Sequence, residues 1–308
     1  MKEKVHTSVL MVRPTNFGYN PETESTNIFQ KKISLPNSEI HRKALYEFDN
    51  FVSVLRNNKI SVKIFNDFPN SVTPDSIFPN NWFSVHKGGI MFIYPMLSGN
   101  RREERRKDII DYLKKASSIE KCIDLSYYEK SGKFLEGTGS LVFDHNSKVA
   151  YANISSRTNI EIAKEVCDNI GYKLIPFVAF DKTGREIYHT NVILSIGNGF
   201  AIVCFESVKA LKDKNILQKS LINSNLEIIE ISLKQMHSFC SNTLNVVNGE
   251  GKDFIIMSET ARNSFTKNQL SVIKKYSAII SPLLKTIECA GGGSARCMMA
   301  EFMDENNN

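Results

Sequence analysis

The sequence predicts an α/β protein, and two observations lead to this class. Short apolar runs rich in β-branched residues alternate with amphipathic stretches from one end of the chain to the other. The composition, 42% apolar and 23% charged residues, is ordinary for a globular protein and provides a sizeable core. The alternation alone favours a doubly wound parallel sheet. The length of 308 residues exceeds the ~100–200 residues typical of one domain, but barrel-like and propeller-like folds also reach it.

The expected strands are runs of Val, Ile, Leu and Phe beside turn residues. They cover residues 9–12, 61–65, 89–93, 141–143, 150–154, 172–176, 192–196, 200–204, 226–229 and 254–257. The expected helices show apolar residues three and four positions apart, as Ile109, Ile110 and Leu113 do. They cover residues 39–57, 102–116, 159–170, 208–217 and 266–276. We expect one compact unit over residues 1–303, followed by a polar end at 304–308 that frays.

The net charge of +6 raises the question of an anionic partner. Its main contributor is the run 101–107, where acidic residues interrupt the basic ones and no aromatic side chain is interleaved to stack on bases. We interpret this run as the solvated start of a helix and expect no nucleic-acid partner. No stretch approaches the ~20 apolar residues of a membrane span, and the N-terminal residues lack the apolar segment of a signal peptide. The sequence therefore predicts a cytoplasmic protein with no membrane partner.

The six cysteines are scattered, at positions 122, 167, 204, 240, 289 and 297, and none forms a C-x-x-C pair. This spacing argues against a zinc site and against a disulfide framework. We expect reduced thiols and no metal or other cofactor.

The C-terminal run 289–301 contains three consecutive glycines and then Cys297, four residues after the last of them. Glycine permits positive φ and close approach to a ligand, and backbone N–H groups beside a thiol can stabilise a developing oxyanion. Cys297 is therefore a candidate nucleophile for a planar carbonyl-like or amidine-like carbon. A buried structural cysteine after a glycine-rich turn fits the composition equally well.

Two further segments place titratable groups at strand edges. Glu136 stands beside two glycines just before the run 141–143, and His189 stands just before the run 192–196. A thiol, an imidazole and a carboxylate can act as nucleophile, general acid/base and orienting group. Each residue alone is more often structural, so the hypothesis depends on the combination.

Four segments together resemble the active-site segments of the guanidino-group-modifying enzymes, the pentein superfamily. They are 74–82 (Pro-Asp-Ser-Ile-Phe-Pro-Asn-Asn-Trp), Glu136-Gly137, 189–191 (His-Thr-Asn) and 291–297 (Gly-Gly-Gly-Ser-Ala-Arg-Cys). The similarity runs in order from Val9 to Glu301 and implies an α/β propeller of five ββαβ modules around a pseudo-fivefold axis. It also implies that the Cys297 thiolate adds to the substrate carbon. His189 would then protonate the departing nitrogen and activate water, while Glu136 positions His189.

Two departures from the pattern bear on the substrate. Deiminases of this superfamily usually hold the guanidinium with two carboxylates, and the corresponding positions here are Asn81 and Asn191. An amide offers both a donor and an acceptor, which suits a neutral ureido group, whereas a buried cation without counter-carboxylates is costly. The double change therefore favours a neutral ureido substrate such as citrulline over arginine. In its motifs the chain resembles the citrulline hydrolase (citrullinase) branch of the amidinotransferase-like group. Strand-edge hydrogen bonding by these amides, or a one-residue shift onto Asn80, remains an alternative.

The resemblance also implies how the amino-acid end of a substrate is bound. Arg157 matches an arginine that pairs with the α-carboxylate, and Arg101 is a candidate second clamp. Asp75 can accept from the α-ammonium, although Asp after Pro is also a common turn former. Residues 16–20 read either as a lid loop or as a surface turn.

The sequence thus predicts a metal-independent cysteine hydrolase of arginine metabolism that converts citrulline to ornithine, carbon dioxide and ammonia. An arginine deiminase or dimethylargininase is the first alternative, and an amidinotransferase that passes the group to an amine is the second. A ribosome-binding pentein without catalysis belongs to a different class. The presence of Glu136, His189 and Cys297 together argues against it. The small-molecule substrate is the expected partner, and a homodimer is compatible with the resemblance.

Overall fold

The computed structural model describes residues 7–304. Its strands are β1 Ser8–Arg13, β2 Ser61–Asn66, β3 Phe83–His86, β4 Ile90–Ile93, β5 Lys121–Asp124, β6 Leu141–Asp144, β7 Val149–Asn153, β8 Lys173–Phe177, β9 Leu194–Ile196, β10 Phe200–Val203, β11 Glu227–Glu230, β12 Leu244–Val247, β13 Asp253–Ile256, β14 Ala278–Ile280 and β15 Ala300–Phe302. Its α-helices are α1 Asn37–Asn57, α2 Gly99–Arg102, α3 Lys107–Ala116, α4 Gly137–Ser140, α5 Ile160–Ile170, α6 Leu211–Asn223, α7 Leu233–His237, α8 Glu259–Ser264, α9 Lys267–Tyr276 and α10 Lys285–Gly291. The 3-10 helices are η1 Pro21–Thr23, η2 Pro79–Asn81, η3 Ser126–Ser131, η4 Thr190–Val192 and η5 Phe205–Ser207.

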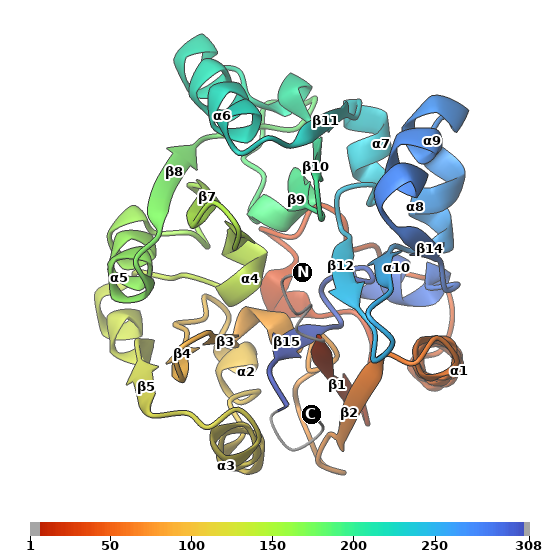
Figure 1. Cartoon of the computed structure of the whole chain (residues 1–308). Helices are drawn as coiled ribbons and strands as arrows, with labels where there is room; N and C mark the ends of the chain where they lie inside the picture. The colour runs from red at the N-terminus through yellow and green to blue at the C-terminus, as the bar shows by residue number, and fades with distance from the viewer. Residues whose placement is uncertain (1–6, 305–308) are drawn as a thin grey trace.

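The strands form five small sheets of three strands each, arranged around a common centre with the longer helices outside (Figure 1). The sheet orders are β15-β1-β2, β3-β4-β5, β6-β7-β8, β11-β10-β9 and β12-β13-β14. In each sheet the middle strand runs antiparallel to one neighbour and parallel to the other. The α/β class and the five modules expected from the resemblance are confirmed, and a single doubly wound sheet is excluded.

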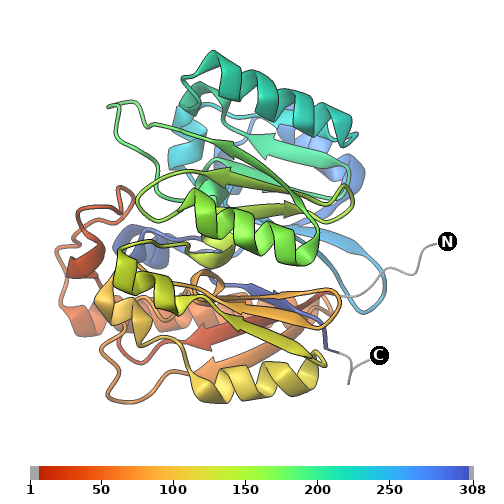
Figure 2. The ribbon, with the colours of Figure 1, turned by 90° about the vertical axis from the view of Figure 1, so that its left-hand side faces the viewer.

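One sheet joins the two ends of the chain. Strand β1 pairs with β2 in parallel and with β15 in antiparallel register, so that Val9 lies opposite Glu301. Figure 2 shows the segment between β1 and α1 on the face of the ring opposite the two termini. The last residues of the chain therefore complete the module that the first residues begin.

Local sequence explains where several helices begin and end. The Asn159 side chain accepts from the amides of Glu161 and Ile162 and starts α5, which ends where Gly171 takes φ 69°. Thr266 and Gln269 form a capping box at the start of α9. These ends agree with the expected helices at 159–170 and 266–276 within one residue.

The expected helix at 102–116 is wrong at its start, and the charged run at 101–107 is solvated only in part, with Glu103 and Lys107 exposed. Helix α2 ends at Arg102 and α3 begins only at Lys107. The side chains of Arg101, Glu104 and Arg106 are buried. They are held by internal partners, as in the Arg101–Glu104 ion pair and the bond from Arg106 to the Asn66 carbonyl. These tertiary contacts outweigh the local helical preference of residues 103–106.

The expected helix at 208–217 is also displaced, because residues 208–210 lie outside the helix and α6 begins at Leu211. Within residues 7–304 no helix has the length and apolarity needed to cross a bilayer. Of the polar end expected to fray, only Asp304 belongs to the described residues.

Candidate active site

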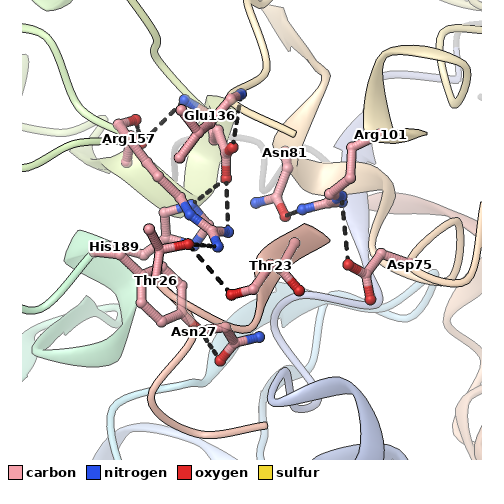
Figure 3. A network of polar contacts seen from close by, with 12 residues as sticks. Thr23, Thr26, Asn27, Asp75, Asn81, Arg101, Glu136, Arg157 and His189 are labelled. Atoms are coloured by element: carbon pink, nitrogen blue, oxygen red, sulfur yellow. Dashed lines mark hydrogen bonds and ion pairs between the residues drawn. The ribbon is translucent and has the colours of Figure 1, made fainter. Parts of the chain in front are cut away.

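A turn precedes the first antiparallel strand of each sheet, and neighbouring turns contact one another. Their buried side chains are Asn81 before β3, Glu136 before β6, His189 and Asn191 before β9, Asn242 before β12 and Cys297 before β15. Figure 3 shows part of this cluster. The fold therefore collects five segments that are far apart in the sequence, and each segment contributes a polar or nucleophilic side chain.

Glu136 and His189 form a buried hydrogen-bonded pair. The Nε2 atom of His189 lies 2.8 Å from Oε2 of Glu136, whose Oε1 accepts from the amide of Leu97 at 3.2 Å. A Cβ placed on Gly139 would lie 2.9 Å from Nδ1 of His189, so only glycine fits there. Because the carboxylate accepts from Nε2–H, the Nδ1 atom is the ring nitrogen left to exchange a proton.

The charges around this pair determine its protonation. Burial would raise the pKa of Glu136, but Arg157 and the hydrogen bond from His189 outweigh burial and hold that pKa below its ordinary range. Burial lowers the pKa of His189, and Glu136 compensates only in part. The pair is therefore a carboxylate beside a neutral imidazole at neutral pH, which suits His189 to accept a proton.

Cys297 lies in the turn between α10 and β15, with 7% of its surface exposed. Gly292 takes φ 68° and ends α10, and Gly291 and Gly293 pack so closely on the Phe78 ring that a Cβ would approach it to 2.9 and 2.7 Å. The glycine run thus ends a helix against an aromatic ring. The Arg296 guanidinium is directed to the Met299 carbonyl and the Glu301 carboxylate.

Two carboxamides contact the thiol. The Nδ2 atom of Asn242 lies 3.2 Å from Sγ of Cys297, and Nδ2 of Asn191 lies 3.7 Å from it. The Oδ1 atom of Asn191 is buried and has no hydrogen-bond partner among residues 7–304. A ligand next to the sulfur therefore meets an open acceptor.

Asn81 has an open hydrogen-bond donor, whereas Asn191 has an open acceptor. The Oδ1 atom of Asn81 accepts from Nη1 of Arg101 at 2.8 Å, while its buried Nδ2 has no partner in the described part of the chain. Arg101 is itself held by a bidentate ion pair with Glu104, at 2.9 Å for each bond. Because a guanidinium only donates, Arg101 fixes the oxygen of Asn81 on its own side and turns the NH₂ group away from it (Figure 3). That NH₂ group lies beside Gly139, where the His189 ring also packs.

The neighbouring Asn80 has a different setting, because its Nδ2 donates to Thr138 at 3.3 Å. If the resemblance is shifted by one position, Asn80 takes the place of Asn81, but the NH₂ group of Asn80 already has a partner. Asn81 is the one with an open donor.

Asp75 and Arg157 each keep one open polar atom. Oδ2 of Asp75 accepts from Asn20 at 2.7 Å, while its buried Oδ1 has no partner within residues 7–304. Burial raises the pKa of Asp75. Arg157 donates to Glu136 and Thr26 and lies over the Tyr188 ring at 4.6 Å, and its Nε is unpartnered among the same residues. The structure thus directs Arg157 mainly to Glu136, and its predicted contact with an α-carboxylate stays a prediction.

The segment 20–30 follows the loop at 16–20 and contacts the cluster, while the role of residues 16–20 as a lid stays a prediction. Thr26 accepts from Arg157, and Asn27 donates to the Gly291 carbonyl at 3.0 Å and accepts from Tyr188 at 3.1 Å (Figure 3). The segment therefore packs against residues of the candidate site.

Sequence reasoning missed Asn242, Glu104 and Asn20. Asn242 had a recognisable signal, since an asparagine just before a strand is also the pattern of Asn81 and Asn191. Asn20 had none, because it contacts Asp75, which only the fold brings near. Glu104 lies three positions from Arg101, but nothing in the charged run distinguishes this buried ion pair from an exposed one.

A His189→Asn variant is expected to lose ~10²–10⁴-fold in rate together with the acid limb of the pH profile. In the wild type kcat/KM should fall as the pH drops below 6.5, because burial lowers the pKa of His189 from that value and the protonated ring cannot accept a proton. Ammonia release measured across the pH range tests this. The control His145→Asn changes a ring bonded to Tyr172, outside the cluster, and should keep both rate and profile. An unaltered profile in His189→Asn would remove this residue from the mechanism.

Five ββαβ sheets around a centre that holds a thiol and a His–Glu pair define a guanidino-group-modifying enzyme of the pentein superfamily. Residues 13–304 match the family described as N,N dimethylarginine dimethylhydrolase, eukaryotic, and the chain belongs to this family. It is accordingly a hydrolase that acts on C–N bonds of guanidino-type groups. A comparison with curated protein sequences finds no match.

Solved structures share the fold at low sequence identity. The N-terminal domain of ArgZ, a cyanobacterial arginine dihydrolase crystallised with substrate, matches with a TM-score of 0.73 and 14% identity over 96% of this chain and 97% of that domain. Apo ArgZ matches with a TM-score of 0.72 and 15% identity, and the aligned part covers 96% of this chain but only 40% of that protein. A dimethylarginine dimethylaminohydrolase adduct gives a TM-score of 0.65 and 14% identity over 97% of this chain and 100% of that one.

Proposed function

We propose that this protein is a cysteine-dependent hydrolase of the ureido group of citrulline, with Cys297 as nucleophile, His189 as general acid/base and Glu136 as the group that positions His189. The products are ornithine, carbon dioxide and ammonia. Membership of the family supports hydrolysis at a guanidino-type carbon. The choice of a ureido group depends on the two asparagines.

The observation that carries this choice is one open donor and one open acceptor around the reacting centre. Arg101 fixes Asn81 so that its NH₂ group is free, and Asn191 keeps a free Oδ1. The carbonyl oxygen of a ureido group can accept from the NH₂ group of Asn81, and a ureido N–H can donate to Oδ1 of Asn191. A guanidinium has only donors, which would face the Asn81 NH₂ group and leave it unsatisfied at a cost of about 1–3 kcal/mol.

The reaction follows from these positions. The Cys297 thiolate adds to the ureido carbon, and the negative charge that develops on the oxygen is stabilised by Nδ2 of Asn81. Nδ1 of His189, which has taken the proton of the Cys297 thiol, delivers that proton to the departing nitrogen as the C–N bond breaks, and a thioester remains on Cys297. His189 then takes a proton from water, which attacks the thioester, and the resulting carbamate releases carbon dioxide and the second amine. Loss of ornithine first or of ammonia first leads to the same products.

The α-ammonium and α-carboxylate groups of the substrate would contact the remaining buried polar atoms that have no partner among residues 7–304. Oδ1 of Asp75 can accept from the α-ammonium, and Nε of Arg157 can donate to the α-carboxylate. The donors of Arg101 are directed to Glu104, Asn81 and the Phe78 carbonyl, so Arg101 acts through the orientation of Asn81.

A second candidate substrate is N,N-dimethylarginine, because the matched family is described by it. Its hydrolysis would give citrulline and dimethylamine at the same thiol. The free NH₂ group of Asn81 favours the ureido substrate over this cation.

Citrulline is expected to be hydrolysed ~10⁴-fold more efficiently than arginine or N,N-dimethylarginine, because a site built on specific hydrogen bonds rejects analogues that leave its groups unpaired. Parallel assays of the wild type should follow ornithine, ammonia, citrulline and dimethylamine for the three substrates. Equal kcat/KM for citrulline and arginine would contradict the proposal. Preferential release of dimethylamine would establish the second candidate.

A further inference from the structure

Among the polar side chains of residues 7–304, Asn242 makes the shortest contact with the thiol, yet nothing in the proposed chemistry assigns it a role. It belongs to the buried turn between α7 and β12. Neighbouring residues fix this turn to the adjacent module, since Ser241 donates to the Val192 carbonyl and Thr243 is 2.8 Å from Ser195. The side chain of Asn242 is therefore presented to the sulfur by a turn that is itself held on both sides.

One hydrogen bond fixes the orientation of the Asn242 carboxamide. Its Oδ1 accepts from the backbone amide of Arg296 at 3.0 Å, and only an oxygen can accept there. The NH₂ group is consequently the end nearer to Cys297, with Nδ2 at 3.2 Å from Sγ, while Oδ1 accepts from the neutral thiol at the longer distance of 3.6 Å. An N–H donor at this position stabilises a sulfur that carries negative charge more than a neutral thiol.

The groups around the sulfur strengthen the case for an amide. Arg296, the cation next to the nucleophile in sequence, pairs with Glu301 and donates to the Met299 carbonyl. The side-chain donors that contact Sγ are the neutral amides of Asn242 and Asn191, and the Asn191 contact is longer at 3.7 Å. Thiolate stabilisation therefore depends on dipoles at close range.

We propose that Asn242 is a further catalytic residue, which donates from Nδ2 to Cys297 and stabilises the thiolate of the free enzyme. This inference depends on Cys297 being the nucleophile of the proposed function. Its readout, however, is the reactivity of one thiol and requires no substrate. A wrong substrate assignment would therefore leave the result intact.

The test is alkylation of the full-length protein by iodoacetamide as a function of pH, with the Cys297 peptide quantified by mass spectrometry. In Asn242→Asp the Oδ1 acceptor for Arg296 remains, but a carboxylate oxygen replaces the donor near the sulfur. The alkylation rate of Cys297 at neutral pH should fall by about tenfold or more, with the half-maximal rate shifted upward by about one pH unit. Asn242→Ala should shift it in the same direction by a smaller amount. Cys289, which is partly exposed, serves as an internal reference in every sample.

Asn245→Ala is the matched control, because Asn245 lies on β12 close to this turn, donates to the Phe254 carbonyl and Ser277, and accepts from the Asn198 amide. This variant should lower the melting temperature without moving the pH profile of Cys297 alkylation. That is the result expected when an asparagine has a structural role alone. An unchanged Cys297 profile in Asn242→Asp and Asn242→Ala overturns the proposal. If both variants fail to fold, the pH profile of Cys297 alkylation in the wild type tests the proposal instead. A Cys297 profile identical to that of a free small-molecule thiol also overturns it, and a profile displaced to lower pH supports it.

Discussion

Replacing Cys297 by Ser is expected to lower kcat for citrulline by ~10⁴-fold or more while leaving the fold intact. A hydroxyl does not ionise usefully near neutral pH, and the neutral amides that contact the sulfur cannot compensate for this. The side chain changes little in volume and Cys297 is almost fully buried, so stability should change by no more than about 1 kcal/mol. Single-turnover ornithine release and thermal unfolding measure the two effects.

The control for this variant is Cys289→Ser, which changes a partly exposed cysteine of helix α10 eight positions earlier in the same segment. It should keep the wild-type rate. If Cys297→Ser retained substantial turnover and Cys289→Ser did not, the nucleophile would have to be reassigned to Cys289. Loss of activity accompanied by loss of the folded state would call for Cys297→Ala before any conclusion about chemistry.

Changing both Asn81 and Asn191 to Asp is expected to remove most of the ~10⁴-fold preference for citrulline over arginine. At position 81 the carboxylate would still accept from Arg101, but it would present an acceptor to the ureido oxygen where the wild type presents a donor. At position 191 a negative charge would stand near the sulfur and also disfavour the thiolate. We therefore expect lower kcat/KM for citrulline and tighter binding of arginine, without a requirement that arginine turnover appears.

Two single variants separate these effects. Asn81→Asp should weaken citrulline turnover without altering the alkylation of Cys297, because among residues 7–304 the side chain of Asn81 bonds to Arg101 and not to the sulfur. Asn80→Asp adds the same charge one position earlier, at a side chain that donates to Thr138, and should alter the preference far less. Retention of the full preference in the double variant, or an equal loss in Asn80→Asp, would contradict the assignment of Asn81.

Much of the fold class could be predicted from local patterns. The alternation of short apolar runs with amphipathic stretches identified most strands and the helices α1, α5 and α9, because burial of one face is the main determinant of such elements. The arrangement of five sheets could not be derived this way. It depends on which strands pair, and the pairing of β1 with β15 joins residues from opposite ends of the chain.

The run 101–107 shows the limit of charge patterning. In the sequence it reads as a solvated helix start, but Arg101, Glu104 and Arg106 are buried among internal partners. The ion pairs of Arg101 with Glu104 and of Arg106 with Asp108 are local and fit an exposed helix start equally well, so burial is recognised only from the more distant partners. The partners of this run include Asn81 and the carbonyls of Asn66 and Phe78, at least twenty positions away.

The sequence by itself determined the chemical types of the candidate site: a cysteine after a glycine run, a histidine and a glutamate at strand edges, and two asparagines in place of carboxylates. Tertiary structure decided how these groups face one another. Arg101 selects which end of Asn81 is free, and the amide of Arg296 does the same for Asn242. An amide side chain has a donor end and an acceptor end of almost equal size. Its role therefore depends on the partner that the fold places beside it, and no local pattern contains that information.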